Sequence, residues 1–467
     1  MTAARIIERP GGPAAWRGRS CFKGLAACCL LGVLLAGGTL PAPASAGGFE
    51  VRLQSSSAAS VAGAGISALA EDASTIAYNP AGMTYLEGFQ TSAGTPVILP
   101  NTSFDNAGTL DATGGVLVGN QNTEDKVAVL PSFFGVWSSP HGFSLGLGVF
   151  SPFGQSTQQD NAWVGRYFNT EAKLTTYNFN PSAAYAVTDW LSLGLGFNAQ
   201  FAKLKLGNAL DFGSICFGTL GLGPGVCPAL GLLPQGADGD VEIEVEDWGF
   251  GFNLGAILEP FEGTRLGLAY RSSVDFDFEG DADFTVPAAA AVVTAGGTLF
   301  QDTGVSGEAT FPETLSASLY HELDDRWTLL GDLTWTRWSR NQELRGVFDN
   351  RAQPDLVETA NWHNSIRASV GATFDVDDTL TLRGGVAFDE SPIPDDFRSA
   401  RLPSEDTVVL GLGATYEIED WLSLAFAYVH TRQWEASIRQ SSPTAGTLVG
   451  DYHANAHILG ADFHLRF

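Results

Sequence analysis

The chain has 467 residues, of which 44% are hydrophobic and only 16% are charged. Lys and Arg total 25 against 52 Asp and Glu, which gives a formal net charge of −27. This balance excludes a nucleic-acid binder that relies on a basic surface, and the high apolar fraction excludes an intrinsically disordered chain. Glycine contributes 55 residues, which is well above its usual share of about 7%.

Residues 1–46 have the composition of a cleavable secretory signal. Basic residues precede an apolar run at 25–35, and the small residues 44–46 (Ala-Ser-Ala) follow it. The run is too short for a membrane-spanning helix, which needs about 20 apolar residues. A lipoprotein signal is the alternative, because residues 25–28 spell Leu-Ala-Ala-Cys, but few apolar residues precede Cys28. We therefore expect cleavage after Ala46.

Two cysteines remain after the expected cleavage. Cys216 and Cys227 are eleven residues apart in a chain that is predicted to be secreted. Secreted proteins normally oxidise such pairs, so we predict a disulfide that closes one loop. The alternative is a pair of unpaired thiols.

Hydrophobic residues alternate with polar or small residues along most of the remaining chain, which indicates β-strands. In the last segment, Leu459, Ala461, Phe463, Leu465 and Phe467 fall on one side of a strand. Fourteen such segments follow residue 87, joined alternately by tight turns and long loops. The tight turns are predicted at 138–142, 188–189, 259–263, 324–325, 375–378 and 417–420, and the long loops near 100–126, 151–172, 207–240, 280–307, 345–360, 391–405 and 435–450.

This regular alternation of joint lengths is typical of an outer-membrane barrel, whose periplasmic turns are short and whose external loops are longer. Trp190, Trp327 and Trp421 each follow a tight turn, where a membrane interface would place amphipathic indoles. The alternative is that they are core tryptophans of a soluble β protein. Unpaired strand edges are not tolerated in lipid, so the sheet must close. We predict an all-β, transmembrane antiparallel barrel of about fourteen strands over residues 87–467, in the bacterial outer membrane.

Residues 47–86 precede the first strand and are predicted to form a hatch inside the barrel. A fourteen-stranded barrel leaves a wide lumen. Within Ser55–Ala70, thirteen of sixteen residues are Gly, Ala or Ser, which can pack closely against a wall. The segment ends in turn residues, Asn79, Pro80, Ala81 and Gly82. The alternative is a flexible periplasmic tail.

Short motifs spread along the chain resemble one known family. Those in the first forty residues after the signal resemble the hatch of the FadL-type long-chain fatty-acid transporters: Gly48-Phe49, Ser55-Ser56-Ser57, Gly63-Ala64-Gly65, Asp72-Ala73 and Asn79-Pro80-Ala81. Later matches are Ser151-Pro152-Phe153-Gly154, Trp163-Val164-Gly165-Arg166, Asn180-Pro181-Ser182, Ala184-Tyr185, Pro312-Glu313-Thr314, Trp335-Thr336-Arg337-Trp338-Ser339, Asp389-Glu390-Ser391-Pro392 and Phe467.

The resemblance implies a fourteen-stranded barrel with an N-terminal hatch that takes up long-chain fatty acids or other hydrophobic compounds. It also implies an apolar lumen pocket with basic residues near the ligand carboxylate, and lateral exit at a kinked third strand. Here that strand is expected at 143–150 and is followed by Pro152, Phe153 and Gly154. Proline lacks the N–H that a neighbouring strand would need, although it could equally just end the strand.

Two external loops are unusually apolar. Residues 208–237 contain one charge, Asp211, and residues 284–300 contain none. Large exposed apolar patches usually mark a binding site, so we predict that these loops capture hydrophobic ligands from outside. The alternative is that the loops only pack on each other over the barrel mouth. The candidate capture residues are Phe212, Phe217, Leu220, Leu222, Leu230, Leu232, Leu233, Val292 and Val293.

Three inward-facing arginines, Arg271, Arg367 and Arg383, could bind an anionic head group. The alternative, which we favour for any single arginine, is ion pairing with Asp332, Asp389 or the hatch. The basic positions of the family pocket cannot be aligned to this sequence, so none is carried over.

No pattern indicates an enzyme, a cofactor or a metal site. Residues 142–146 match Gly-x-Ser-x-Gly in letters, but a nucleophile elbow needs a strand-to-helix turn and this segment alternates as a strand. The expected partners are a hydrophobic ligand, outer-membrane lipid and lipopolysaccharide, with the protein acting as a monomer. The competing functions are a general diffusion porin and an aromatic-hydrocarbon uptake channel; an adhesin and a lipid hydrolase are more remote.

Overall fold

The computed structural model describes residues 47–467 except 219–222, 293 and 295–297. The predicted signal segment, residues 1–46, lies outside the described residues. Every element below belongs to one compact unit.

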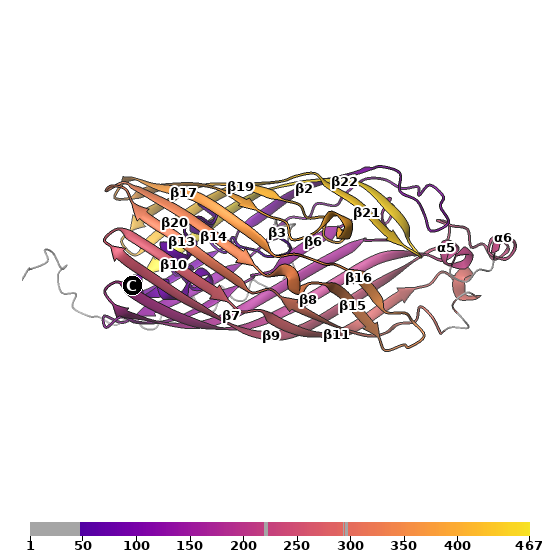
Figure 1. The fold of residues 1–467 in the computed structure, drawn as a ribbon, viewed down its shortest axis with the longest axis horizontal. Coiled ribbons are helices and arrows are strands. Elements are labelled where there is room, and N and C mark those ends of the chain that lie inside the picture. The colour runs from indigo at the N-terminus through magenta and orange to yellow at the C-terminus, as the bar shows by residue number, and fades with distance from the viewer. Residues whose placement is uncertain (1–46, 219–222, 293, 295–297) are drawn as a thin grey trace, which may run out of the picture. The chain divides into compact units, whose positions relative to one another are not determined.

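The unit is a single antiparallel sheet that closes on itself (Figure 1). The first strand, β1, pairs with the last strand, β22, on one side and with β4 on the other. Twenty-two strand segments make fourteen passes of the wall, because several passes are broken into two segments. The predicted closed fourteen-stranded barrel is therefore confirmed.

The strand segments are β1 (Gly88–Gly94), β2 (Val97–Asn106), β3 (Ala128–Val129), β4 (Ser132–Ser138), β5 (Phe143–Phe150), β6 (Gly154–Gln158), β7 (Glu171–Thr188), β8 (Leu191–Asp211), β9 (Asp238–Phe261), β10 (Thr264–Arg271), β11 (Val274–Thr285), β12 (Thr303–Phe311), β13 (Thr314–Glu322), β14 (Trp327–Thr336), β15 (Glu343–Phe348), β16 (Leu356–Thr359), β17 (Ser365–Asp377), β18 (Leu380–Asp389), β19 (Thr407–Glu419), β20 (Leu422–Gln433), β21 (Ala436–Ser442) and β22 (Gly446–Arg466).

Side chains alternate between the two faces of the wall as the sequence pattern predicts. On β22, Leu459 and Phe463 are exposed on the outer face, whereas Asp462 and His464 are buried in the lumen. The inward set also includes the charged residues of the prediction, Asp332, Arg367, Arg383 and Asp389, all buried. Because apolar residues cover the outside and polar residues the inside, the wall suits lipid around a polar lumen.

All six tight turns lie at one end of the barrel, which we call the short-turn end (Figure 1). Trp190, Trp327 and Trp421 are exposed there, as expected for an interfacial girdle. The opposite, long-loop end carries the helices α5 (Phe212–Phe217), α6 (Gly223–Val226), η2 (Pro228–Leu230) and η3 (Ala288–Val292). Of the helices that the structure describes, none combines the length and apolar character needed to cross a bilayer.

The strands run further toward the long-loop end than predicted. Residues 207–240 were expected to be a loop, but β8 continues to Asp211 and β9 starts at Asp238. The same correction applies to 280–307, where β11 ends at Thr285 and β12 starts at Thr303. Outward positions in this region are acidic instead of apolar, so the hydrophobic alternation disappears although the backbone ladder continues. Corrections of the same kind apply at 100–126, 151–172 and 345–360, and at 435–450 most of the predicted loop is strand, in β21 and the start of β22.

Residues 47–86, which we call the N-terminal segment, lie within the barrel, nearer its short-turn end (Figure 1). The segment contains α2 (Ser56–Ser60), α3 (Ile66–Leu69), α4 (Thr75–Tyr78) and η1 (Pro80–Tyr85), nearly all buried. Helix α2 packs on β19 and β20, α3 on β10 and β13, and η1 on β7, β8 and β9.

Wall glycines make room for this segment. A Cβ added to Gly255, Gly267 or Gly385 would overlap an oxygen of Asn79, Ser67 or Val61 respectively. Part of the high glycine content therefore reflects the close approach of two backbones inside the lumen.

Candidate functional site

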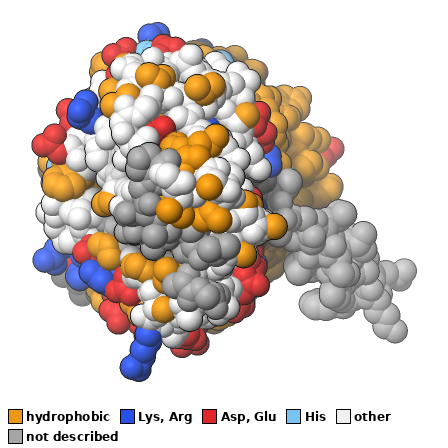
Figure 2. Space-filling view, turned by 90° about the vertical axis from the view of Figure 1, so that its right-hand side faces the viewer, with side chains coloured by type: hydrophobic (Ala, Val, Ile, Leu, Met, Phe, Trp, Pro, Cys, Tyr) orange, Lys and Arg blue, Asp and Glu red, His pale blue; other side chains and the backbone are white. Residues whose placement is uncertain are grey.

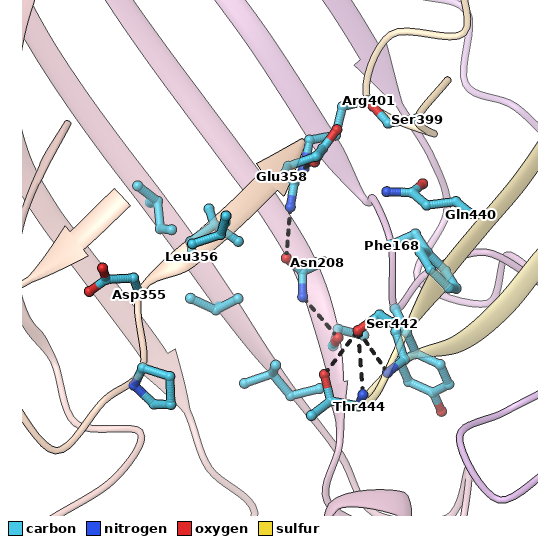
Figure 3. A pocket seen from close by; sticks show the side chains of 18 of the residues that line it. Phe168, Asn208, Asp355, Leu356, Glu358, Ser399, Arg401, Gln440, Ser442 and Thr444 are labelled. Carbon is cyan, nitrogen blue, oxygen red and sulfur yellow. Dashed lines mark hydrogen bonds and ion pairs between the residues drawn. The ribbon is translucent and has the colours of Figure 1, made fainter. Parts of the chain in front are cut away.

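A cavity of about 650 Å³ lies toward the long-loop end (Figure 3). We call it the outer cavity. Its volume falls within the range of sites that take drug-sized ligands. Residues from β8, β9, β16 and β21 line it, together with the loop that follows β18.

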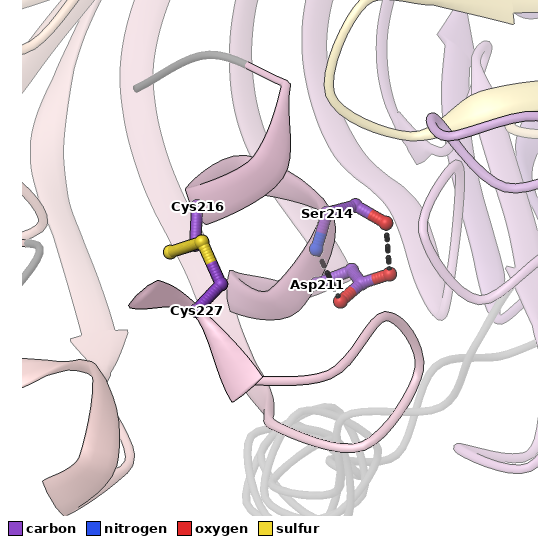
Figure 4. The surroundings of a disulfide bond; sticks show 4 residues. All are labelled: Asp211, Ser214, Cys216 and Cys227. Atoms are coloured by element: carbon purple, nitrogen blue, oxygen red, sulfur yellow. Dashed lines mark hydrogen bonds between the residues drawn. A yellow bond between two sulfur atoms is a disulfide. The ribbon is translucent and has the colours of Figure 1, made fainter. Parts of the chain in front are cut away.

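One wall of the outer cavity is apolar and comes from the two loops singled out in the sequence. Its members are Leu210, Ile215, Phe284, Leu299 and Phe300. Behind them the loops form a small core that includes Phe212, Leu232, Cys216 and Cys227. A disulfide joins the two cysteines, and Asp211 caps α5 by accepting a hydrogen bond from the Ser214 amide at 3.0 Å (Figure 4). These two loops thus pack into one unit that borders the cavity.

The predicted capture residues divide between this core and the surface. Phe212 and Leu232 are fully buried, Phe217 and Leu230 pack against the core, and Leu233 is 53% exposed. Leu220, Leu222 and Val293 lie outside the described residues, as does the side chain of Val292. Figure 2 looks onto the long-loop end and shows hydrophobic side chains gathered on that face. The loops therefore pack on each other and also expose apolar side chains.

A second, inner cavity of about 330 Å³ shares Glu358, Phe397, Ser399 and Arg401 with the outer cavity. Its lining is mainly apolar and includes Phe49, Leu174, Leu204, Leu206, Phe278, Phe311, Leu344 and Trp362. The two cavities follow one another from the barrel mouth into the lumen, with the shared residues at their junction.

Arg401 lies at the junction of the two cavities and is only 8% exposed. Its Nε donates to Glu358 at 3.2 Å and its Nη2 to Asn208 at 3.3 Å (Figure 3). Its Nη1 is buried and has no hydrogen-bond partner among the described residues. A buried donor without a partner is costly, so this nitrogen is available to an anionic oxygen.

Arg401 was not among the residues predicted from the sequence. The available signal was a pair of arginines, Arg398 and Arg401, in an external loop of a chain that has only 25 basic residues. Arg398 is fully engaged, because its guanidinium binds Asp395 at 2.8 Å and also Glu405. Only the structure distinguishes the paired arginine from the available one.

The three predicted lumen arginines lie deeper, against the N-terminal segment. Arg367 pairs with Asp389 at 3.5 Å and donates to the carbonyl of Ala62 at 2.7 Å. Arg383 pairs with Glu71 at 2.6 Å. Arg271 lines a separate small cavity, described below. Two of the three thus make the ion pairs that the alternative interpretation expected.

Asn79 fixes the end of the N-terminal segment to the wall. It is fully buried, and its Nδ2 donates to the carbonyls of Ser67 at 2.7 Å and Ala256 at 3.1 Å. Its Oδ1 accepts a hydrogen bond from the Ala81 amide at 3.0 Å. Pro80 then begins η1 with its φ already suited to a helical turn. Gly82 leaves no space for a side chain, because an added Cβ would overlap the Thr75 hydroxyl.

The wall is interrupted between β5 and β6, at a break that contains Pro152 and Phe153 and ends where Gly154 begins β6. Pairing between β4 and β5 stops at Phe133 and Val149, and among the described strands β6 pairs only with β7. The N-terminal segment covers this break from inside. Val51 donates to the Pro152 carbonyl at 2.8 Å, and the amide of Gly154 donates to the Phe49 carbonyl at 2.9 Å.

Phe49 also closes the inner cavity. Its ring lies 4.7 Å from Trp338, 5.0 Å from Phe311 and 5.7 Å from Phe153, measured between ring centroids. Beyond this aromatic cluster lies the small cavity that contains Arg271. The cluster therefore separates the inner cavity from the space next to the break in the wall.

Within the described ranges, no three His, Cys, Asp or Glu residues converge as a metal site. Ser144, in the Gly-x-Ser-x-Gly match, lies inside strand β5, and its hydroxyl is within hydrogen-bond distance of Ser138, at 2.8 Å.

Comparison with known sequences shows the family. Residues 39–467 match the family described as outer membrane protein transport protein (OMPP1/FadL/TodX). The chain belongs to this family. A putative outer membrane protein of Neisseria meningitidis serogroup B is 30% identical over 456 residues, covering 92% of this chain and 97% of the relative. The long-chain fatty acid transport protein of Escherichia coli K12 is 29% identical over 438 residues, covering 90% and 94%.

Solved structures show the same fold. A Pseudomonas aeruginosa FadL homologue superposes with a TM-score of 0.82 at 23% identity and covers 90% of this chain and 100% of that one. The Ralstonia pickettii toluene transporter TbuX gives a TM-score of 0.62 at 22% identity, covering 88% and 98%. As a member of this family, the chain is an outer-membrane transport protein, and the long-loop end is the external end.

Proposed function

We propose that the protein takes up long-chain fatty acids or closely related hydrophobic carboxylates across the outer membrane. The observation that carries this proposal is the unpaired Nη1 of Arg401 at the junction of two largely apolar cavities. A largely apolar space with a buried, available cationic donor matches a long hydrocarbon tail with an anionic head. The names of several relatives support the same substrate class.

The proposed route starts at the apolar loops around α5 and continues through the outer cavity into the inner cavity. The N-terminal segment, residues 47–86, acts as a hatch, and residues 87–467 form the channel wall. Withdrawal of Phe49 opens the aromatic cluster, and the ligand leaves sideways at Pro152, Phe153 and Gly154. No step requires a covalent reaction, a cofactor or a nucleotide, so the protein acts as a channel and not as an enzyme.

A general diffusion porin fits less well, because the N-terminal segment fills the lumen and docks into wall glycines. An aromatic-hydrocarbon channel is the closer alternative, since a toluene transporter shares the fold. The two candidates differ at Arg401, because a neutral arene gains only a weak cation–π contact from a guanidinium, whereas a carboxylate gains a charged hydrogen bond.

The experiment compares uptake of labelled oleate and labelled toluene by cells that lack other channels of this family. We expect wild-type protein to take up oleate with a half-saturating concentration that rises about ten-fold in Arg401→Gln, the effect of losing one charged hydrogen bond. Arg432→Gln, an exposed change on the outer face of β20, is the matched control and should behave as wild type.

If the wild type takes up neither compound, the transport proposal fails. If toluene enters and oleate does not, the aromatic-hydrocarbon alternative replaces it. Equal oleate affinity in Arg401→Gln and wild type would contradict the role of Arg401.

A further inference from the structure

Five amide side chains gather on the lumen face of β7, β8 and β9. All are at most 3% exposed: Asn178, Asn180, Asn198, Gln200 and Asn253. Four of them hydrogen-bond to one another, with Asn178 Nδ2 donating to Asn198 at 2.9 Å, Asn180 Nδ2 to Asn253 at 2.8 Å and Asn198 Nδ2 to Asn253 at 3.3 Å. Gly196 allows this packing, because an added Cβ would overlap the cluster.

The amide cluster has unused hydrogen-bonding capacity. Asn178 Oδ1, Gln200 Nε2 and Asn253 Nδ2 are buried and have no partner in the part of the chain that the structure describes. Each unmade bond at a buried polar atom costs about 1–3 kcal/mol, so native proteins rarely leave several together. Two of the three atoms are N–H donors, which indicates a polar occupant able to accept hydrogen bonds.

Arg271 lies beside the cluster at the end of β10. Its Nη1 donates to Asn198 Oδ1 at 2.8 Å and its Nη2 to the carbonyl of Ala77, in α4, at 2.7 Å. Its guanidinium carbon lies 5.4 Å from the centre of the Phe150 ring. Arg271 therefore contacts the amide cluster, the N-terminal segment and Phe150, the last residue of β5 before the break in the wall.

Unlike Arg367 and Arg383, Arg271 makes no ion pair with any described residue. The acid that lines the same cavity is Glu50, and its carboxylate is already bound by Arg52 at 2.7 Å. Glu50 therefore acts on the cation of Arg271 only from a distance, and no acid among the described residues pairs with it directly. A half-buried cation without a paired acid calls for an anionic partner.

Arg271 and Asn253 line a cavity of about 70 Å³ together with Pro152 and Phe153. This volume would hold about two water molecules, which is also the space that a carboxylate group needs. The cavity lies between the aromatic cluster of Phe49 and the break in the wall. It is therefore placed where the head group of a departing ligand would pass.

We propose that Arg271 and the amide cluster form a second head-group site, which binds the carboxylate of the ligand between the inner cavity and the lateral exit. The inference rests on the proposed function and deepens it. A carboxylate at this position replaces the Ala77 carbonyl on Nη2, because a charged acceptor binds a guanidinium more strongly than a neutral one. Binding therefore also releases one contact that holds α4 to the wall.

The test compares Arg271→Gln and Arg271→Lys with a matched control, Arg265→Gln. Arg265 lies on the same strand and also donates to a carbonyl of the N-terminal segment, that of Leu69 at 3.2 Å. It packs between the rings of Tyr85 and Tyr320 and does not line the cavity. Uptake rates are measured for oleate and for its neutral methyl ester.

We expect Arg271→Gln to lower the maximal oleate uptake rate about ten-fold, while the half-saturating concentration, which the outer and inner cavities set, stays unchanged. Methyl oleate uptake should be unaffected, Arg271→Lys should retain most oleate uptake, and Arg265→Gln should behave as wild type. Equal losses in the Gln and Lys variants, or in Arg265→Gln, would overturn the proposal by showing that a structural contact and not the charge matters.

A binding readout separates this inference from the transport proposal. Purified protein in detergent is titrated with oleate carrying ¹³C in its carboxyl group, and bound carboxylate signals are counted. Two bound signals are expected in wild type, with one lost in Arg271→Gln and the other in Arg401→Gln. A single bound signal in wild type, lost only in Arg401→Gln, would refute the second site while leaving the proposed function intact.

Discussion

Replacing Gly255 by alanine tests whether wall glycines hold the N-terminal segment in place. The new Cβ would overlap Asn79 Oδ1, so the Asn79 side chain must move. Asn79 Nδ2 donates one hydrogen to the Ser67 carbonyl and shares the other between two wall carbonyls, those of Ala256 at 3.1 Å and Leu268 at 3.4 Å. At about 1 kcal/mol for one net hydrogen bond, losing this shared bond weakens docking by about 1 kcal/mol. That change raises the undocked population about five-fold.

Amide hydrogen exchange, read by mass spectrometry on detergent-solubilised protein, measures this population directly. Peptides covering residues 72–86 should exchange about five-fold faster in Gly255→Ala than in wild type, while strand peptides keep their protection. Gly331→Ala is the control, because its Cβ would lie on the outer face, 3.9 Å from Leu319 Cβ, in ordinary contact. Identical exchange of this segment in Gly255→Ala and wild type would refute the role assigned to the wall glycines.

Two further perturbations address the path and the loops. Phe49→Ala removes the ring that packs on Trp338 and should raise single-channel conductance in planar bilayers; unchanged conductance would mean that another group closes the inner cavity. Burial alone would raise the pKa of Asp111, but hydrogen bonds from Thr113 and Gln235 outweigh it and hold the pKa below its usual value of 3.8. The contact between the Asp111 carboxylate and Gln235, which joins the two loops, is therefore present above pH 3.8. It is lost as the pH falls through the lower pKa that Asp111 has in the folded protein. Hydrogen exchange of residues 106–128, corrected for the intrinsic rate, should rise at pH 3 in wild type and already at pH 7 in Asp111→Asn; equal rates in both proteins at pH 7 would contradict this.

The barrel could be predicted from the sequence because lipid imposes one requirement on every second residue of each strand. That requirement made Leu459 and Phe463 recognisable as outward residues and Asp462 as an inward one. It ends at the membrane boundary. Beyond it, Glu244 and Asp281 stand directly opposite on the outer faces of β9 and β11, so the hydrophobic pattern vanishes while the ladder continues.

The candidate site was less predictable because pairing inside a barrel joins residues that are far apart in sequence. Nothing local distinguishes Arg401, with one guanidinium nitrogen free of partners among the described residues, from Arg398, which is fully paired. Similarly, Arg383 finds its partner, Glu71, more than 300 positions away in the N-terminal segment. Composition can show that inward charges exist, but only the closed sheet decides which of them neutralise one another.

Closure of the ligand path and closure of the wall depend on the same few residues. The Phe49 ring fills the aromatic cluster at the base of the inner cavity, and its carbonyl accepts the amide of Gly154 at the break in the wall. Two residues later, Val51 donates to the Pro152 carbonyl. A displacement of residues 49–51 must therefore open the cavity and uncover the break together. The proposed route therefore has one barrier at this point and not two. Opening the inner cavity alone would still break these hydrogen bonds, but the ligand would not use the exit that they cover.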